Sequence, residues 1–193
     1  MTDEFQVSAS PLENARNLVL QKIGRNLVNF QKLEAMLKHL LVAGQAEGFT
    51  SQLEEQVKRT ASSVSRMTLG ALVQEMATTL FDNNTTTQGR LELVPEVWLS
   101  MKLTLEGGQE AAESWKKEML AIVKERNELV HQMLASFDPN SIQSCEALGV
   151  ALDAQRTRVL PVYEHIQSLL VALKRSQIEM LEHLPDGTVN RPR

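Results

Sequence analysis

An arginine, an asparagine and a histidine lie close together in one strongly helical segment, in the string Arg126-Asn127-Glu128-Leu129-Val130-His131. Such side chains can cleave RNA. A histidine transfers protons near neutral pH, an arginine holds a phosphate bidentately, and an asparagine amide can orient either group. Attack of a 2′-hydroxyl on its own phosphate needs a base, an acid and positive charge, but no metal ion. We therefore interpret Arg126, Asn127 and His131 as candidate catalytic residues that use no metal or other cofactor.

The surrounding helix has an apolar stripe, formed by Met119, Val123, Val130, Leu134 and Phe137. This spacing predicts a helix from about 109 to 137 with one face turned toward a core or a partner. At about 100° per residue, Arg126 and Asn127 should project into that face, with His131 at its border. Because a buried guanidinium is costly unless it is paired, we expect either a structural ion pair or a site on an interface.

The motif contains one histidine, whereas cleavage needs two proton-transfer groups, a base and an acid. Two copies of the helix related by a twofold axis would bring a second Arg126 and a second His131 into the same cleft. The sequence therefore predicts a homodimer with a composite site. Lys117 and Lys124 precede His131 at intervals of seven residues, so we expect them to form a short basic track that binds RNA.

The elements that must position these residues are mostly helical. A capping box, Ser10 to Glu13 with Pro11 at the first helical position, opens a long helix that ends at Gly44. A second capping box predicts a helix over 51–62, and a third helix is expected over 69–81. A final helix is predicted over 142–183 after an exposed turn at 138–141, with a break or kink just before Pro161.

Between the third and fourth predicted helices the apolar period shortens to two, which predicts a small β-hairpin over about 90–106. The expected fold class is therefore mainly α, a helical bundle with a small inserted hairpin. We expect one domain over residues 1–184, followed by a mobile C-terminal tail over 185–193.

Composition narrows the function classes. The chain has 193 residues, a net charge of −4 and a single cysteine, Cys145. These values argue against a broad nucleic-acid-binding surface and against a disulfide-stabilised secreted protein. The N-terminus has acidic residues where a secretory signal has basic ones, and no apolar run is long enough for a membrane span. We expect a cytoplasmic protein with no membrane association.

The string Arg-Asn-x-x-x-His near the end of one long helix, followed by another long helix, resembles the R-x4-6-H motif of the HEPN family, the higher eukaryotes and prokaryotes nucleotide-binding domains. The resemblance covers the motif and its flanking helices, and the predicted hairpin departs from the minimal family core. It implies a dimeric, metal-independent endoribonuclease, of the kind found in toxin–antitoxin and phage-defence systems. Arg126 and His131 would be the motif arginine and histidine, and Asn127 the polar residue that often follows the arginine. An antitoxin or regulatory protein would be a further partner.

Three alternatives remain open. HEPN domains include non-catalytic interaction or sensing modules, and the net negative charge favours such a module slightly. A purely structural helical dimer is the second alternative. In the third, a structural interpretation of the motif, Arg126 pairs with a nearby carboxylate while Asn127 and His131 satisfy buried backbone groups. The other histidines lack metal-ligand spacing, and Cys145 is expected to be a small buried hydrophobe.

Overall fold

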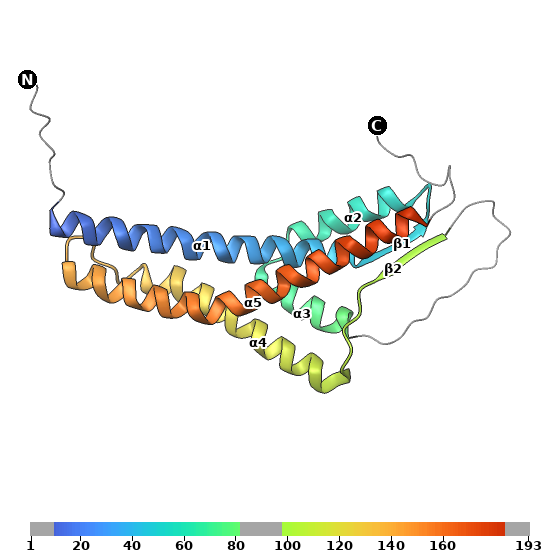
Figure 1. The fold of residues 1–193 in the computed structure, drawn as a ribbon. Helices are drawn as coiled ribbons and strands as arrows, with labels where there is room; N and C mark the ends of the chain where they lie inside the picture. Colours follow the sequence, from blue (N-terminus) through green and yellow to red (C-terminus); the bar gives the residue numbers. More distant parts are fainter. Residues whose placement is uncertain (1–9, 82–97, 184–193) are drawn as a thin grey trace, which may run out of the picture. The chain divides into compact units, whose positions relative to one another are not determined.

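The structure is a computed structural model, and the residues that it describes are 10–81 and 98–183 (Figure 1). The expected fold class is confirmed: the described chain is mainly helical with one small antiparallel strand pair. Its elements are, in chain order, α1 (Pro11–Ala43), β1 (Gln45–Phe49), α2 (Leu53–Ser65), α3 (Leu69–Leu80), β2 (Trp98–Lys102), α4 (Gly108–Glu128), a π-helical turn η1 (Leu129–Met133) and α5 (Ile142–Glu182). The tail predicted over 185–193 lies outside the described residues.

The chain divides into two compact units. The first comprises Met1–Lys32 and Lys124–Val162, and the second comprises Leu33–Val123 and Tyr163–Arg193. Helices α1, α4 and α5 each contribute residues to both units. The motif string from Arg126 to His131 belongs to the first unit.

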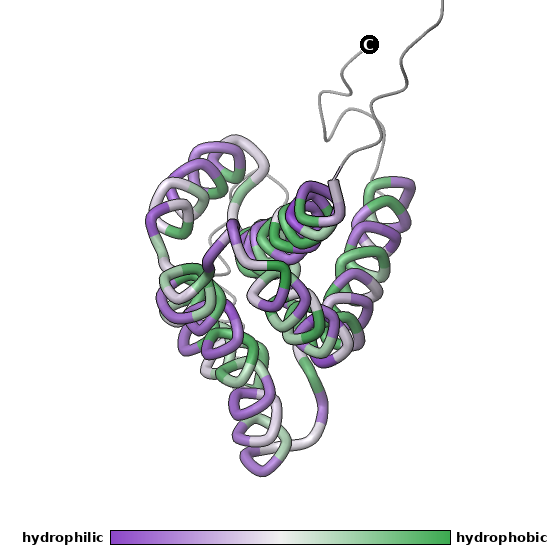
Figure 2. The backbone as a smooth tube through the Cα atoms, turned by 90° about the vertical axis from the view of Figure 1, so that its left-hand side faces the viewer, coloured by the Kyte–Doolittle hydropathy of each residue, from purple (hydrophilic) through white to green (hydrophobic). Residues whose placement is uncertain are grey.

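The first unit is a small helical core built from the start of α1, the turn η1 and the first part of α5. Apolar side chains recur at helical spacing along each segment, and Figure 2 shows the same alternation of apolar and polar positions along the tube. The buried apolar residues are Val19, Ile23, Phe30, Leu129, Cys145, Leu148, Leu152, Val159 and Val162. Two buried residues in this core are polar, Asn26 and Gln155.

Helix α1 begins with the predicted capping box. The Ser10 backbone N–H donates to the Glu13 carboxylate at 2.7 Å, and the Glu13 N–H donates to the Ser10 hydroxyl at 3.2 Å. Two N–H groups that the first helical turn leaves without partners are thereby satisfied. The pKa of Glu13 is lowered, first by its hydrogen bond from the Ser10 backbone and then by that from the Ser10 side chain.

The second unit has a larger apolar core. Its buried residues come from the second part of α1, from α2 and α3, and from the adjoining parts of α4 and α5; they are Leu33, Leu37, Leu40, Leu41, Val64, Leu69, Leu72, Val73, Met76, Ala77, Leu80, Trp115, Met119, Ile122, Ile166 and Leu173. Helix α3 starts at the Thr68 hydroxyl, which accepts the Ala71 N–H at 3.3 Å. Six of its side chains are buried, and five of these are large apolar groups, so α3 is a central helix of this core.

The strand pair differs in part from the predicted hairpin. Strand β2 lies inside the predicted range 90–106, but it pairs antiparallel with β1, from Gln45↔Lys102 to Phe49↔Trp98. The other half of the predicted hairpin lies among residues 82–97, outside the described part of the chain. At one end of the two strands, the paired residues Phe49 and Trp98 make an edge-to-face contact with ring centroids 4.9 Å apart. The sequence did not predict β1 because it is short and shows no strict alternation.

Gly44 makes the change from α1 to β1 possible. Its N–H donates to the Leu40 carbonyl at 2.8 Å, and its own carbonyl accepts the Leu103 N–H at 2.8 Å. A Cβ atom at this position would lie 2.6 Å from the Leu40 oxygen and 2.9 Å from Leu103 Cβ. Only glycine therefore allows the residue after β2 to approach the end of α1 this closely.

Two helix boundaries differ from the prediction. Helix α2 begins at Leu53 and ends at Ser65, and Gln52 at its N-cap makes no side-chain capping hydrogen bond. Helix α5 continues through Pro161, so the predicted break is not observed. Pro161 and Thr157, four residues earlier, are both exposed. Water can therefore hydrogen-bond the Thr157 carbonyl that loses its N–H partner, which lowers the cost of proline inside the helix.

Within the described residues, each helix is too short or too polar to span a lipid bilayer.

Burial in the second unit gives a stability prediction. Leu72 is 0% exposed, so Leu72→Ala should lower the free energy of unfolding by about 2–5 kcal/mol through lost transfer energy and a residual cavity. Val171 is 63% exposed, and Val171→Ala should change stability by about 0.5 kcal/mol or less. Urea denaturation followed by circular dichroism measures both. Equal effects of the two substitutions would contradict the assignment of Leu72 to the core.

Candidate active site

The three candidate catalytic residues lie where α4 changes its helical period. Arg126 and Asn127 are in the last turn of α4, and His131 is at the centre of the π-helical turn Leu129–Met133. The Leu134 N–H donates to the Leu129 carbonyl at 3.1 Å, an i to i+5 hydrogen bond. The predicted α-helix over 109–137 therefore ends at Glu128. Residues 134–136 form a turn, so the π-helical turn is the C-terminal end of this helix and His131 lies in its last residues.

The orientation of the motif differs from the prediction. Asn127 and His131 are exposed and Arg126 is partly buried, whereas we expected Arg126 and Asn127 to point into an apolar face. The buried stripe keeps Met119 but uses Ile122 and Leu129 in place of Val123 and Val130, so it is rotated around the helix toward these two residues. The larger pair of apolar side chains is thus buried, Asn127 and His131 lie outside the core, and Arg126 is partly buried.

The Arg126 guanidinium has an amide partner. Its Nη1 donates to Asn127 Oδ1 at 3.0 Å. Among the residues that the structure describes, no carboxylate forms an ion pair with Arg126, and no hydrogen bond orients the His131 ring. The structural interpretation, in which Arg126 pairs with a carboxylate while Asn127 and His131 satisfy buried groups, is thus not observed in this part of the chain.

The two lysines proposed as an RNA-binding track are both exposed. Lys117 belongs to the second unit and Lys124 to the first. Lys124 Nζ lies 3.6 Å from Glu128 Oε1, and its side chain is 77% exposed, so this ion pair is weak and leaves the ammonium accessible. The binding role of both lysines remains a prediction.

The carboxylate immediately before the motif is held by another helix. Glu125 accepts hydrogen bonds from Arg158 of α5 through both carboxylate oxygens, one from Nε and one from Nη2 at 3.0 Å. The Glu125 side chain is only 14% exposed while that of Arg158 is 56% exposed, so this bidentate pair is shielded from solvent on the carboxylate side only. The pKa of Glu125 is lowered by the Arg158 hydrogen bond, against the opposing effect of burial.

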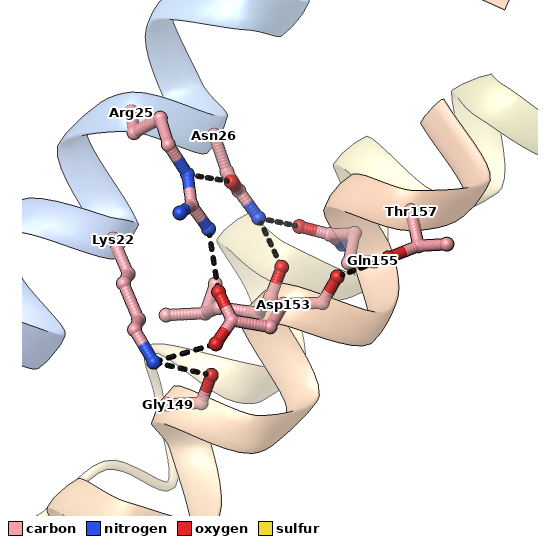
Figure 3. Close-up of polar contacts among 8 residues, drawn as sticks. Lys22, Arg25, Asn26, Gly149, Asp153, Gln155 and Thr157 are labelled. Carbon is pink, nitrogen blue, oxygen red and sulfur yellow. Dashed lines mark hydrogen bonds and ion pairs between the residues drawn. The ribbon is translucent and has the colours of Figure 1, made fainter. Parts of the chain in front are cut away.

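Gln155 of α5 joins the end of α4 to α1. Its Nε2 donates to the Glu125 backbone carbonyl at 2.8 Å, and its Oε1 accepts from Asn26 Nδ2 at 3.1 Å. Asn26 Nδ2 also donates to the Leu152 carbonyl at 2.9 Å, and Figure 3 shows both contacts of this amide. Gln155 and Asn26 are 1% and 2% exposed. Removal of the hydrogen-bond partner of either side chain would therefore lower the free energy of unfolding by about 1–3 kcal/mol.

An exposed ion-pair cluster continues the same network. Asp153 accepts from Lys22 Nζ at 2.6 Å and from Arg25 Nη2 at 3.0 Å, and Arg25 Nε donates to Asn26 Oδ1 at 3.1 Å (Figure 3). The pKa of Asp153 is lowered by these two hydrogen bonds, that from Lys22 having the larger effect. The network therefore links α1 to α5 on the surface as well as in the core.

Sequence reasoning missed Glu125, Gln155 and Arg158. One signal was available: Gln155 occupies a core position in the apolar pattern of its helix, between Leu152 and Val159. A polar residue at such a position indicates a specific partner. Arg158 gave no signal, because an arginine next to a core position is ordinary on an amphipathic helix.

Other chemistry-bearing residues do not gather into a site. Within residues 10–81 and 98–183, no group of three His, Cys, Asp or Glu side chains is placed to hold a metal ion. Cys145 is 2% exposed, which fits the expected small hydrophobic role. His39, His165 and His183 are exposed, and His183 Nδ1 lies 2.7 Å from the Glu179 carbonyl.

Comparison with known proteins adds no relative. The chain matches no family model, no curated protein and no solved structure. Any functional assignment therefore depends on the residues themselves and on the motif resemblance.

The Glu125 pair predicts a pH dependence of stability. Because Arg158 lowers the folded-state pKa of Glu125 from its ordinary value of 4.5, the pair stabilises the fold above that value. This contribution is lost as the pH falls through the lowered pKa. Glu125→Gln should therefore reduce the loss of stability on acidification, measured as urea midpoints at several pH values below about 5. In an Arg158→Gln background the same substitution should have a much smaller effect, and identical pH profiles of wild type and Glu125→Gln would contradict the assignment.

Proposed function

We propose that this protein is a metal-independent endoribonuclease of HEPN type that acts as a homodimer. The observation that carries the proposal is the motif geometry. The Arg126 guanidinium is hydrogen-bonded to the neutral amide of Asn127, and His131 lies on a π-helical turn. Both Asn127 and His131 are exposed. In this proposal Arg126 binds the scissile phosphate and stabilises the phosphorane. His131 transfers protons, and Asn127 orients the phosphate or the Arg126 side chain.

The acidic residues that give the chain its net negative charge are less of an obstacle to RNA binding in the first unit, which carries the motif, than in the second. The sequence of the first unit, residues 1–32 and 124–162, contains eight Lys and Arg and eight Asp and Glu, so the net charge of −4 of the whole chain comes from the second unit. Affinity for a phosphate backbone depends on local cations. The motif therefore lies in a neutral unit, so the net negative charge of the whole protein is a weaker objection to RNA binding at this place.

A composite site would supply what one chain lacks. Each chain has one motif histidine, while cleavage by 2′-hydroxyl attack needs both an acid and a base. Exposed Asn127 and His131 side chains are available for a twofold contact between copies. In the dimer, the second chain would provide the partner that orients each imidazole.

The biological setting follows from the resemblance alone. A HEPN ribonuclease of this kind would act in the cytoplasm as a toxin or phage-defence effector, with an antitoxin or regulatory protein to restrain it. Lys117 and Lys124 would contribute to RNA binding outside the cleavage site. No metal or other cofactor takes part in the proposed chemistry.

The second candidate function is a non-catalytic HEPN interaction module. It is favoured by the His131 ring, which has no orienting hydrogen bond among the described residues of a single chain. A catalytic histidine usually has such a partner. A purely structural dimer through the same surface is a further form of this alternative.

The first prediction from this proposal concerns assembly. The purified protein should be a symmetric dimer, because a monomer holds only half of the composite site. Light scattering at micromolar concentration measures the mass, and the Asn127→Cys variant should form an intermolecular disulfide if the two motifs face each other. A stable monomer would contradict the composite site.

The second prediction concerns chemistry. Wild-type protein in EDTA should cut single-stranded RNA and leave cyclic-phosphate or 3′-phosphate ends, and its expression should slow growth. His131→Ala should abolish both effects and leave the dimer intact, and Arg126→Ala should reduce cleavage by at least about 10²-fold through lost charge stabilisation. Gel analysis of labelled RNA and end-group mapping measure the outcome.

His165→Ala is the matched control for this experiment. His165 is an exposed histidine outside the motif, so its removal should leave cleavage unchanged. If wild type and His131→Ala behave identically over a broad RNA panel, the nuclease proposal is wrong and the interaction module is favoured.

A further inference from the structure

Glu125 is the residue immediately before the motif arginine, and it is fixed to α5 at two points. Its carboxylate accepts hydrogen bonds from both Nε and Nη2 of Arg158, the second at 3.0 Å. Its backbone carbonyl accepts from Gln155 Nε2 at 2.8 Å, and the same nitrogen lies 3.4 Å from Glu125 Oε2. Residue 125 is therefore held at the main chain and at the side chain by one helix.

Without Arg158, this carboxylate would compete for the motif arginine. Sequence neighbours do not normally face each other on a helix, but a guanidinium on a long stem can reach around it. The structure contains two such contacts: Arg126 to Asn127 at 3.0 Å and Arg25 to Asn26 at 3.1 Å. A carboxylate binds a guanidinium more strongly than an amide oxygen does, so a released Glu125 would be a preferred partner of Arg126.

We infer that Arg158 is a positioning residue that sequesters the Glu125 carboxylate and so keeps the Arg126 guanidinium available for a phosphate group. Arg158 itself is not required to touch RNA, although its side chain is 56% exposed. The inference rests on the proposed function, because it assigns a purpose to the available guanidinium that the nuclease needs. It also explains why an acidic residue can stand directly beside a phosphate-binding arginine.

The test separates binding from cleavage and from folding. Four proteins are compared: wild type, Arg158→Gln, Glu125→Gln and the double variant. The probe is a fluorescent 2′-O-methyl oligoribonucleotide, which cannot be cleaved by 2′-hydroxyl attack, and affinity is measured by anisotropy below the unfolding transition of every variant. Arg175→Gln is the matched control, because it removes the same charge from α5 and breaks an exposed pair with Glu179.

Arg158→Gln should weaken binding of the oligonucleotide by about three- to tenfold, the effect of compromising one charge-assisted contact. Adding Glu125→Gln should restore the affinity to within about twofold of wild type, since no carboxylate then competes for Arg126. Glu125→Gln alone and Arg175→Gln should change it by less than about twofold. Equal weakening in Arg158→Gln and in the double variant would overturn the inference, because Arg158 would then bind RNA directly.

A second readout works without RNA. The Arg126 Nε–Hε resonance should shift in Arg158→Gln and return to its wild-type position in the double variant. If wild type does not bind the oligonucleotide but the resonance moves in this way, the nuclease proposal fails and the sequestration of Glu125 stands. If the resonance is the same in all four proteins, the inference fails whatever the RNA result.

Discussion

The hydrogen bonds of Gln155 are the constraint on which the first unit depends. One buried side chain satisfies the Glu125 carbonyl of α4 and the Asn26 amide of α1, so three helix segments share a single polar contact point. Apolar packing alone allows a helix to slide or rotate by small amounts. A buried amide whose N–H and C=O groups are both hydrogen-bonded does not allow such movement. Any shift would leave a donor or an acceptor unsatisfied in a dry environment.

This constraint also explains the electrostatics around the motif. Once the Glu125 carbonyl is fixed, its side chain lies within reach of Arg158, and a bidentate pair forms at the edge of the core. Arg126 is the next residue, yet its partner among the described residues is a neutral amide. The ion pair of Glu125 and Arg158 is therefore positioned by a neutral hydrogen bond in the core of the unit.

Local patterns predicted much of the fold. The Ser10–Glu13 capping box and the apolar period predicted both ends of α1 correctly, and the alternation near residue 100 indicated β2. Strand β1 was missed because its partner lies about fifty residues away in sequence, and pairing across that distance leaves no local signal. A break or a kink was predicted at Pro161, and no break occurs, because local exposure decides whether a lost backbone bond is costly.

The candidate site was predictable in identity but not in orientation. The string from Arg126 to His131 identifies the residue types, while their direction depends on whether Val123 and Val130 or Ile122 and Leu129 enter the core. Both choices keep helical spacing, so periodicity alone could not separate them. The support from Gln155 and Arg158 comes from about thirty residues further along the chain, and one sequence contains no signal that connects these positions to the motif.

The π-helical turn has a consequence for how such a motif can vary. This wider turn forms the last residues of the helix, so the direction of the histidine depends on the local number of residues per turn as well as on its distance from the arginine. A change of helical period between an arginine and a histidine therefore allows the number of residues between them to vary while the angle between the two side chains around the helix axis is kept.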